Sequence, residues 1–86
     1  MVNQFVQFAN PLLRRPIVQQ LTGDSRTTLY RKIKRKLLTE PVQIGGGRVA
    51  WPQNEIVAIN QARIAGKNDE QIMALVNELH AARLIQ

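Results

Sequence analysis

The 86 residues suffice for one small domain, and a hydrophobic fraction of 44 % allows a core. The absence of cysteine excludes a disulfide framework and a cysteine-based zinc finger, and no apolar run approaches the roughly 18 residues that span a bilayer. The N-terminus also lacks the basic start and the long apolar stretch of a signal peptide. We therefore expect a cytoplasmic protein without a membrane partner.

The net charge of +6 is unevenly distributed along the chain. Residues 1–51 carry nine lysines and arginines against two acids, a net charge of +7. Residues 52–86 carry three against four, a net charge of −1. A strongly basic half favours a polyanion such as nucleic acid as the partner. The alternative is a basic surface that serves only solubility.

An N-terminal arm and two short helices are expected first. Residues 1–11 lack a helical period, so we expect an arm that forms a short strand or packs an aromatic ring on the domain. Pro16 suits the first position of a short helix, which Gly23 ends. Ser25 is a suitable N-cap for a second helix from Arg26 to about Leu38. On one side of this second helix an apolar residue recurs at every fourth position, at Leu29, Ile33 and Leu37.

A β-hairpin is predicted after the break at Thr39–Pro41. Val42–Ile44 and Arg48–Trp51 alternate in polarity around the glycines Gly45–Gly47. Two short strands with an arginine at the tip, Arg48, are typical of a wing. The alternative is a flexible glycine linker.

Two further helices are expected in the last third of the chain. Pro52 suits the first position of one helix, with Glu55 in its first turn and Gly66 at its end. Asp69 is the expected N-cap of the last helix, over residues 67–86. The apolar stripe of that helix consists of Ile72, Leu75, Val76 and Leu79. This stripe either packs on its own domain or pairs with a second subunit, which would give a homodimer or a cooperative array.

The junction of the first two helices has the spacing of a helix-turn-helix. The first helix ends at Gly23, and a polar cap opens the second helix two residues later. Packing the apolar stripe of the second helix against the first leaves its N-terminal positions free to enter the major groove of a duplex. The candidate DNA contacts are Ser25, Arg26, Thr27, Tyr30, Arg31, Lys34 and, on the wing, Arg48. Arg26 and Arg31 suit guanine edges or phosphates, and Arg48 suits the minor groove or a phosphate.

Some of these residues have simpler explanations. Tyr30 either contacts DNA or flanks the core, and Trp51 is expected in the core because it joins a strand to a helix. The acids are scattered, and the glycine turn lacks the lysine and the helix of a phosphate-binding loop. His80 has no cysteine, histidine or paired acid near it in the sequence. We therefore expect neither an enzyme nor a metal or other cofactor.

The sequence resembles the AlpA-type prophage regulatory proteins, small winged helix-turn-helix factors related in fold to MerR-type domains and excisionases. The resemblance covers about residues 12–64. It is carried by Leu12-Leu13-Arg14, Pro16, Leu21-Thr22-Gly23, Ser25-Arg26-Thr27-Thr28-Leu29-Tyr30-Arg31, Pro41-Val42, Gly45–Arg48 and Trp51. It implies a mainly α fold with a small β-hairpin, a winged helix-turn-helix to which an extra C-terminal helix is added. It also implies DNA contacts at Ser25, Arg26, Thr27, Tyr30 and Arg31, and a wing contact at Arg48.

Two positions depart from the family pattern. Asp24 follows the turn glycine where the family usually has an apolar residue, and Lys32 stands at a second position that is commonly apolar. The departures remove one expected apolar contact between the helices and narrow the stripe of the second helix to Leu29 and Ile33.

The sequence thus predicts an arm over residues 1–11, a DNA-binding domain over 12–66 and a C-terminal helix over 67–86. The expected function is sequence-specific binding of double-stranded DNA by a nucleoid-associated regulator of a bacterium or prophage. It would act as an activator, a repressor or an excision directionality factor, in contact with an integrase or RNA polymerase. The alternatives are a protein-binding modulator that occludes a response regulator or integrase, and an RNA-binding protein.

Overall fold

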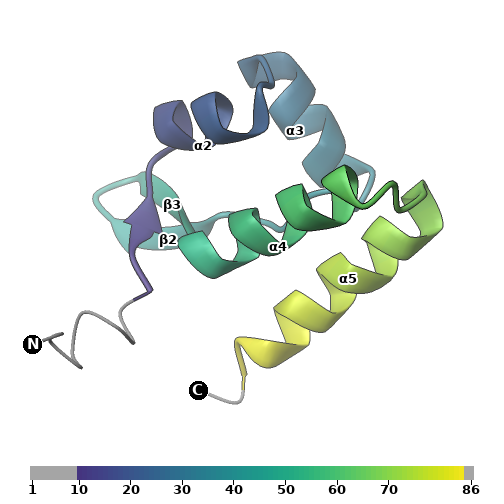
Figure 1. The fold of residues 1–86 in the computed structure, drawn as a ribbon. Helices are drawn as coiled ribbons and strands as arrows, with labels where there is room; N and C mark the ends of the chain where they lie inside the picture. Colours follow the sequence, from purple (N-terminus) through teal and green to yellow (C-terminus); the bar gives the residue numbers. More distant parts are fainter. Residues whose placement is uncertain (1–9, 85–86) are drawn as a thin grey trace, which may run out of the picture.

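The computed structural model describes residues 10–84, so residues 1–9 of the arm predicted over residues 1–11 lie outside the described residues. Four helices and a three-stranded antiparallel sheet make up the described part (Figure 1). In chain order these are β1 (Leu12–Leu13), α2 (Arg15–Thr22), α3 (Arg26–Lys34), β2 (Val42–Gly45), β3 (Arg48–Pro52), α4 (Gln53–Ile64) and α5 (Asp69–Ala82). The mainly α winged helix-turn-helix with an added C-terminal helix is thereby confirmed.

Local signals set the turn between α2 and α3. Gly23 adopts a left-handed conformation with φ 76°, and its N–H donates to the carbonyl of Gln19, which closes α2. The Oγ of Ser25 accepts a hydrogen bond from the N–H of Thr28 at 3.1 Å and caps α3. α2 begins at Arg15, one residue earlier than expected, because Pro16 fits any first-turn position whose N–H has no intrahelical partner.

The predicted end of the second helix at Leu38 is wrong, because α3 ends at Lys34. The chain turns at Lys36, which adopts a left-handed φ of 65°. Leu37 and Leu38 are both buried beyond this turn. In a continued helix these neighbours would point about 100° apart, so only one of them could face the core. Burial of both leucines therefore favours the turn at Lys36 over about one further turn of helix.

The hairpin forms as predicted, and the glycine-linker alternative is wrong. β2 pairs with β3 in antiparallel register, and the two-residue turn consists of Gly46 and Gly47, with φ of 60° and 72°. Two successive positive φ angles suit a type I′ turn, whose twist matches that of the strands. Gly45 extends β2 rather than belonging to the turn. Pro52 ends β3 and is the N-cap of α4, not its first residue, because its ψ of 133° is extended.

β1 is a further strand that no sequence signal predicted. It contains only two residues, and it joins the sheet through pairing of Leu12 with Pro52 and of Leu13 with Trp51. The strand order β1-β3-β2 places β3 in the centre. β1 thereby holds the start of α2 against the base of the wing.

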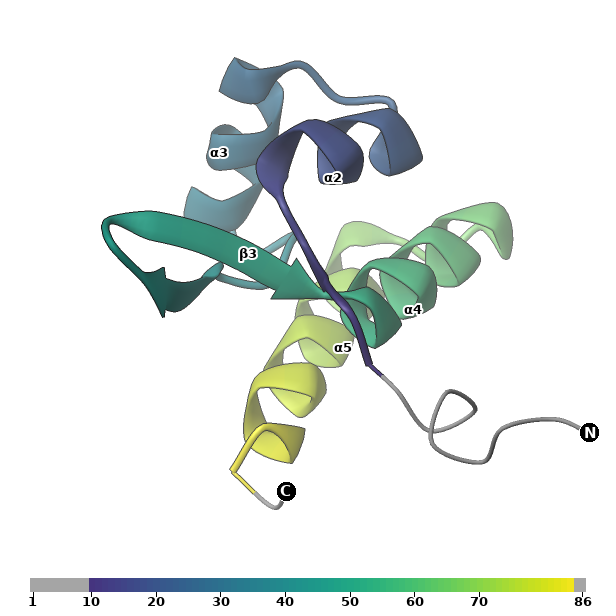
Figure 2. The ribbon, with the colours of Figure 1, turned by 90° about the vertical axis from the view of Figure 1, so that its left-hand side faces the viewer.

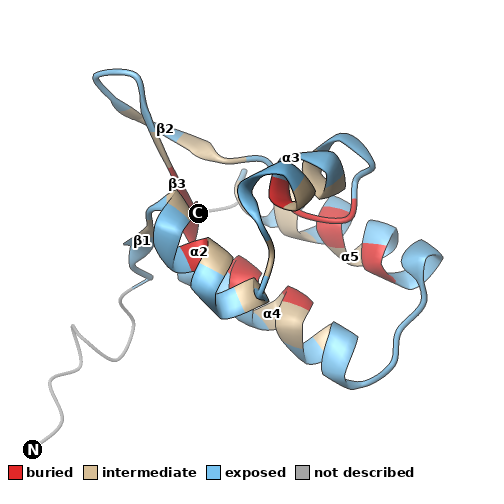
Figure 3. Cartoon of the chain, turned by 90° about the horizontal axis from the view of Figure 1, so that it is seen from above, coloured by how far each residue is buried: buried red, intermediate tan, exposed pale blue. Residues whose placement is uncertain are grey.

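The core lies between the helices and the central strand. Trp51 is fully buried, as expected, and its indole N–H donates to the carbonyl of Thr39 at 2.9 Å. In Figure 3 the buried positions on α2, α4 and α5 face the interior, whereas the tip of the hairpin is exposed. The core consists of Val18, Leu29, Leu37, Leu38, Trp51, Ile56, Ile59, Ile72 and Val76.

The apolar stripe of α5 packs on its own domain. Ile72 and Val76 belong to the core, and Leu75 and Leu79 pack against it. Figure 1 shows α5 beside α4. Asn68 caps α5 in a reciprocal capping box with Gln71, so Asp69 is the first helical residue and not the cap as predicted. The asparagine one residue earlier provides the side-chain oxygen that the cap requires.

Candidate DNA-binding surface

Five of the predicted contact residues share one exposed face of α3. Successive residues of a helix are rotated by about 100°, so these five fall within an arc of about 140°. The residues are Arg26, Thr27, Tyr30, Arg31 and Lys34, and all of them are exposed. Leu29 is buried and Ile33 packs against the core on the other side of the helix. The packing of α3 on the core therefore turns a face with three cations and two hydroxyl groups toward solvent.

Ser25 has a different role from these five residues. Its hydroxyl accepts from the N–H of Thr28 and donates to Oγ1 of Thr28 at 3.0 Å. The hydroxyl is therefore occupied by the cap and orients the N-terminus of α3. The N–H groups of the first turn favour anions at this end of the helix, where a phosphate would approach.

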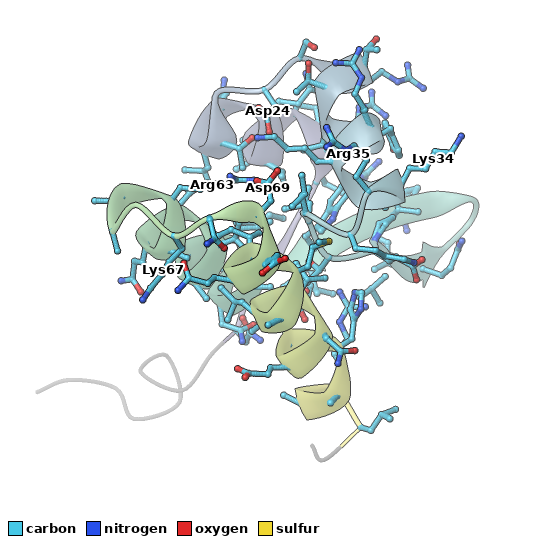
Figure 4. The ribbon with its side chains drawn as sticks, turned by 90° about the vertical axis from the view of Figure 1, so that its right-hand side faces the viewer. Asp24, Lys34, Arg35, Arg63, Lys67 and Asp69 are labelled. Carbon is cyan, nitrogen blue, oxygen red and sulfur yellow. The ribbon has the colours of Figure 1, made fainter. Side chains whose placement is uncertain are left out.

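The wing lies on the same side of the molecule as α3. Figure 2 shows α3 and the hairpin on one side and α4 on the other. Arg48 is exposed at the start of β3, and its Nε donates to the carbonyl of Gly45 at 3.3 Å, across the tip of the hairpin. Figure 4 shows Lys34 extending outward on the side of the hairpin, whereas Arg63, Lys67 and Asp69 lie at the α4–α5 end. The exposed cations Arg26, Arg31 and Lys34 of α3 and Arg48 of the wing thus belong to elements that lie on one side of the molecule.

The two departures from the family pattern pair with each other. The ammonium group of Lys32 donates to both carboxylate oxygens of Asp24, at 3.0 Å and 2.9 Å. The side chain of Asp24 is only 11 % exposed and that of Lys32 is 30 % exposed. The pair therefore joins the turn to α3 where apolar packing was expected. Sequence reasoning treated the two residues separately, although their spacing of eight residues across a helix start was a usable signal.

A second ion pair, between α4 and α5, was missed altogether. Glu55 is 2 % exposed, and its Oε1 and Oε2 accept from Nη2 and Nε of Arg83 at 2.6 Å and 2.7 Å. The hydrogen bond to Glu55 raises the pKa of the Arg83 guanidinium above its ordinary value, and nearby negative charge acts in the same direction. Arg83 therefore remains charged at neutral pH. No local pattern relates two residues that are 28 positions apart.

Comparison with known proteins identifies the family. The model of the family described as prophage CP4-57 regulatory protein (AlpA) matches residues 11–63. The chain belongs to the AlpA family of prophage regulatory proteins. The matched segment begins just before β1 and ends near the last residue of α4, so it contains α2, α3 and the wing. The AlpA family is regulatory rather than enzymatic, and membership indicates a DNA-binding regulatory role.

A curated relative supports the same assignment. The protein named uncharacterized protein ORF88 of Enterobacteria phage P4 is 42 % identical over 55 residues, which make up 64 % of this chain and 62 % of the relative. The chain thus matches somewhat less than two thirds of the length of this relative. No solved structure matches this chain. Among residues 10–84, no helix is both long and apolar enough to cross a membrane.

Proposed function

We propose that this AlpA-family chain is a nucleoid-associated regulator that binds a specific site on double-stranded DNA. The α3 helix lies in the major groove, and Arg48 on the wing reaches the adjacent minor groove or backbone. Residues 12–66 form the DNA-binding unit. The observation that carries the proposal is the position of the exposed α3 face and of the wing tip on one side of the molecule.

Not every cation of the basic half of the chain belongs to the proposed DNA-binding face. Lys32 is paired with Asp24 and lies outside the exposed arc, so it does not count among the cations that face DNA. Arg26, Arg31, Lys34 and Arg48 are exposed, and Arg35 and Lys36 follow directly after α3. With roughly four to six phosphate contacts, the logarithm of the binding constant should fall with the logarithm of salt concentration with a slope of about −4 to −5.

The alternative function, occlusion of a response regulator or integrase, loses one of its two supports. That hypothesis relied on the apolar stripe of the last helix and on the short N-terminal arm. The stripe is packed into the core, whereas residues 1–9 of the arm lie outside the described residues. The same observation removes the basis for a homodimer or an array formed through that stripe. Contacts with an integrase or with RNA polymerase stay predictions.

The experiment is a salt titration of binding by fluorescence anisotropy. The full chain is titrated against duplexes from its own genomic neighbourhood and against scrambled duplexes of equal length. We expect the best neighbourhood duplex to bind at least about 10³-fold more tightly than the scrambled duplexes. This factor is the lower end of the ratio between specific and non-specific affinity for sequence-specific DNA-binding proteins. Equal and weak binding to both sets would refute the proposal. The position of the bound site, at a promoter or at an attachment site, then distinguishes transcriptional control from excision.

A further inference from the structure

The main chain at Glu40, just before the wing, is held by the end of α5. The N–H of Glu40 donates to Nε2 of His80 at 3.0 Å. The carbonyl of Glu40 accepts from Nη2 of Arg83 at 2.6 Å. His80 and Arg83 are three positions apart, so they lie on the same side of the helix end. Both backbone groups of one residue are therefore bound by side chains from an element that follows it by 40 residues.

Arg83 and the segment that it holds are each fixed by further hydrogen bonds. Arg83 is itself fixed by two hydrogen bonds to Glu55, which is buried at the start of α4. On the other side of the segment, the carbonyl of Thr39 accepts from the indole of Trp51 in the central strand. The Thr39–Glu40 segment is thus held between α5 and β3.

We propose that His80 and Arg83 are positioning residues for the wing. Glu40 is separated from β2 only by Pro41, whose ring fixes its own φ, so an orientation imposed at Glu40 passes stiffly into the hairpin. The chain between the end of α3 and the start of β2 is short, and side chains hold its main chain at Thr39 and Glu40. His80 and Arg83 therefore set where Arg48 lies relative to α3, and thus which groove positions the two elements reach together.

The positioning residues lie outside the part of the chain that carries the family resemblance. The family model ends at residue 63, whereas His80 lies in the last turn of α5 and Arg83 is the C-cap of that helix. The DNA contacts of the proposed function and the residues that orient one of them thus come from different segments. The inference depends on the proposed function for its effect on DNA binding, but not for its effect on the hairpin itself.

The test is a double-mutant cycle between the helix end and the wing tip. His80→Leu removes the acceptor for the Glu40 N–H, whereas His80→Gln keeps an oxygen at a similar reach and is the matched control. Each variant is combined with Arg48→Ala, and binding of the full chain to its specific duplex is measured. A role in stability alone would leave the effect of Arg48→Ala unchanged.

Arg48→Ala reduces the binding constant by a certain factor in the wild type. We expect this factor to be at least about threefold smaller in the His80→Leu background, since residues in one network couple to this extent. In the His80→Gln background the effect of Arg48→Ala should be that of the wild type. If the effect of the double variant on the binding constant equals the product of the two single effects to within about twofold, the positions are independent and the proposal is overturned.

A second measurement needs no DNA. Amide hydrogen exchange should be about two- to tenfold faster at Glu40 and in β2 and β3 of His80→Leu, which is the loss expected for one hydrogen bond, while exchange in α4 is unchanged. Uniform acceleration throughout the protein would contradict the proposal. If the wild type binds no specific duplex, the proposed function fails, and the exchange pattern alone decides whether the helix end holds the wing.

Discussion

Removal of Arg83 is expected to destabilise the protein far more than its position near the C-terminus suggests. Arg83→Met leaves the carboxylate of Glu55, which is 2 % exposed, without its cationic partner. Breaking a buried ion pair from one side costs about 3–5 kcal/mol of unfolding free energy. The side chain of Arg83 is 23 % exposed, so water can partly replace it, and we expect the lower end, about 3 kcal/mol. A domain of this size is stable by roughly 4–13 kcal/mol, so the loss is a large fraction of the total.

The assay is thermal and urea unfolding followed by circular dichroism. The midpoint temperature of Arg83→Met should fall by about 12–24 °C, because each kcal/mol corresponds to about 4–8 °C in a domain this small. Arg63→Met is the matched control, since Arg63 pairs with Asp69 at 3.4 Å and the two side chains are 36 % and 56 % exposed. An exposed pair contributes about 0–1 kcal/mol, so this variant should unfold almost as the wild type does.

Replacement of both members separates the charge from the packing. Glu55→Leu combined with Arg83→Met should recover most of the lost stability, because an apolar pair of similar volume is often as stable as the buried ion pair.

The raised pKa of Arg83 means that its stabilisation is present below the ordinary arginine pKa and is lost only as pH rises through the raised value. Stability at neutral pH should therefore not depend on titration of Arg83. A loss below about 1 kcal/mol in Arg83→Met would refute the reasoning.

Three further predictions concern the contact surface, the turn and the core. Arg26→Ala or Arg31→Ala should weaken binding to the specific duplex by about 1–3 kcal/mol and binding to scrambled DNA much less, with the distant Lys67→Ala as control; equal losses on both duplexes would make the residue a phosphate contact. A double-mutant cycle of Asp24→Ala and Lys32→Ala, measured by urea unfolding, should give a coupling of about 0.5–1 kcal/mol, and a value of zero would show that the pair does not hold the turn. Thr39→Val should raise the unfolding free energy by about 1 kcal/mol, because the buried Oγ1 of Thr39 has no hydrogen-bond partner among residues 10–84, and a loss of stability would indicate a partner for that hydroxyl.

The elements that could be predicted are those with a local cause. The left-handed Gly23 and the Ser25 cap are sequence-local, and they place the turn of the helix-turn-helix within a residue of its expected position. The hairpin follows equally from a glycine pair that accepts positive φ between alternating strands. The end of α3 could not be predicted, because it depends on how Leu37 and Leu38 reach the core.

The remaining features of the fold could not be predicted, because they depend on contacts between segments that are distant in the sequence. The two-residue strand β1 forms only because β3 offers a free edge for Leu12 and Leu13. The pair of Glu55 and Arg83 depends on the angle at which α5 returns along α4, which no periodicity encodes. For the candidate site, the exposed face of α3 follows from the helical period once the buried side is known. The sequence suggested Ser25 both as the cap of this helix and as a DNA contact, and in the structure its hydroxyl is engaged in the cap.

The most direct test of the account is a titration of the ¹⁵N-labelled full chain with its specific duplex, followed by the amide chemical shifts. We predict that the largest changes occur at Arg26–Lys34 and at the hairpin tip, Gly46–Arg48, and that residues near Lys67 at the α4–α5 end change little. Changes concentrated on α4 and α5, with α3 and the hairpin tip unaffected, would contradict the claim that α3 and the wing form the DNA-binding surface.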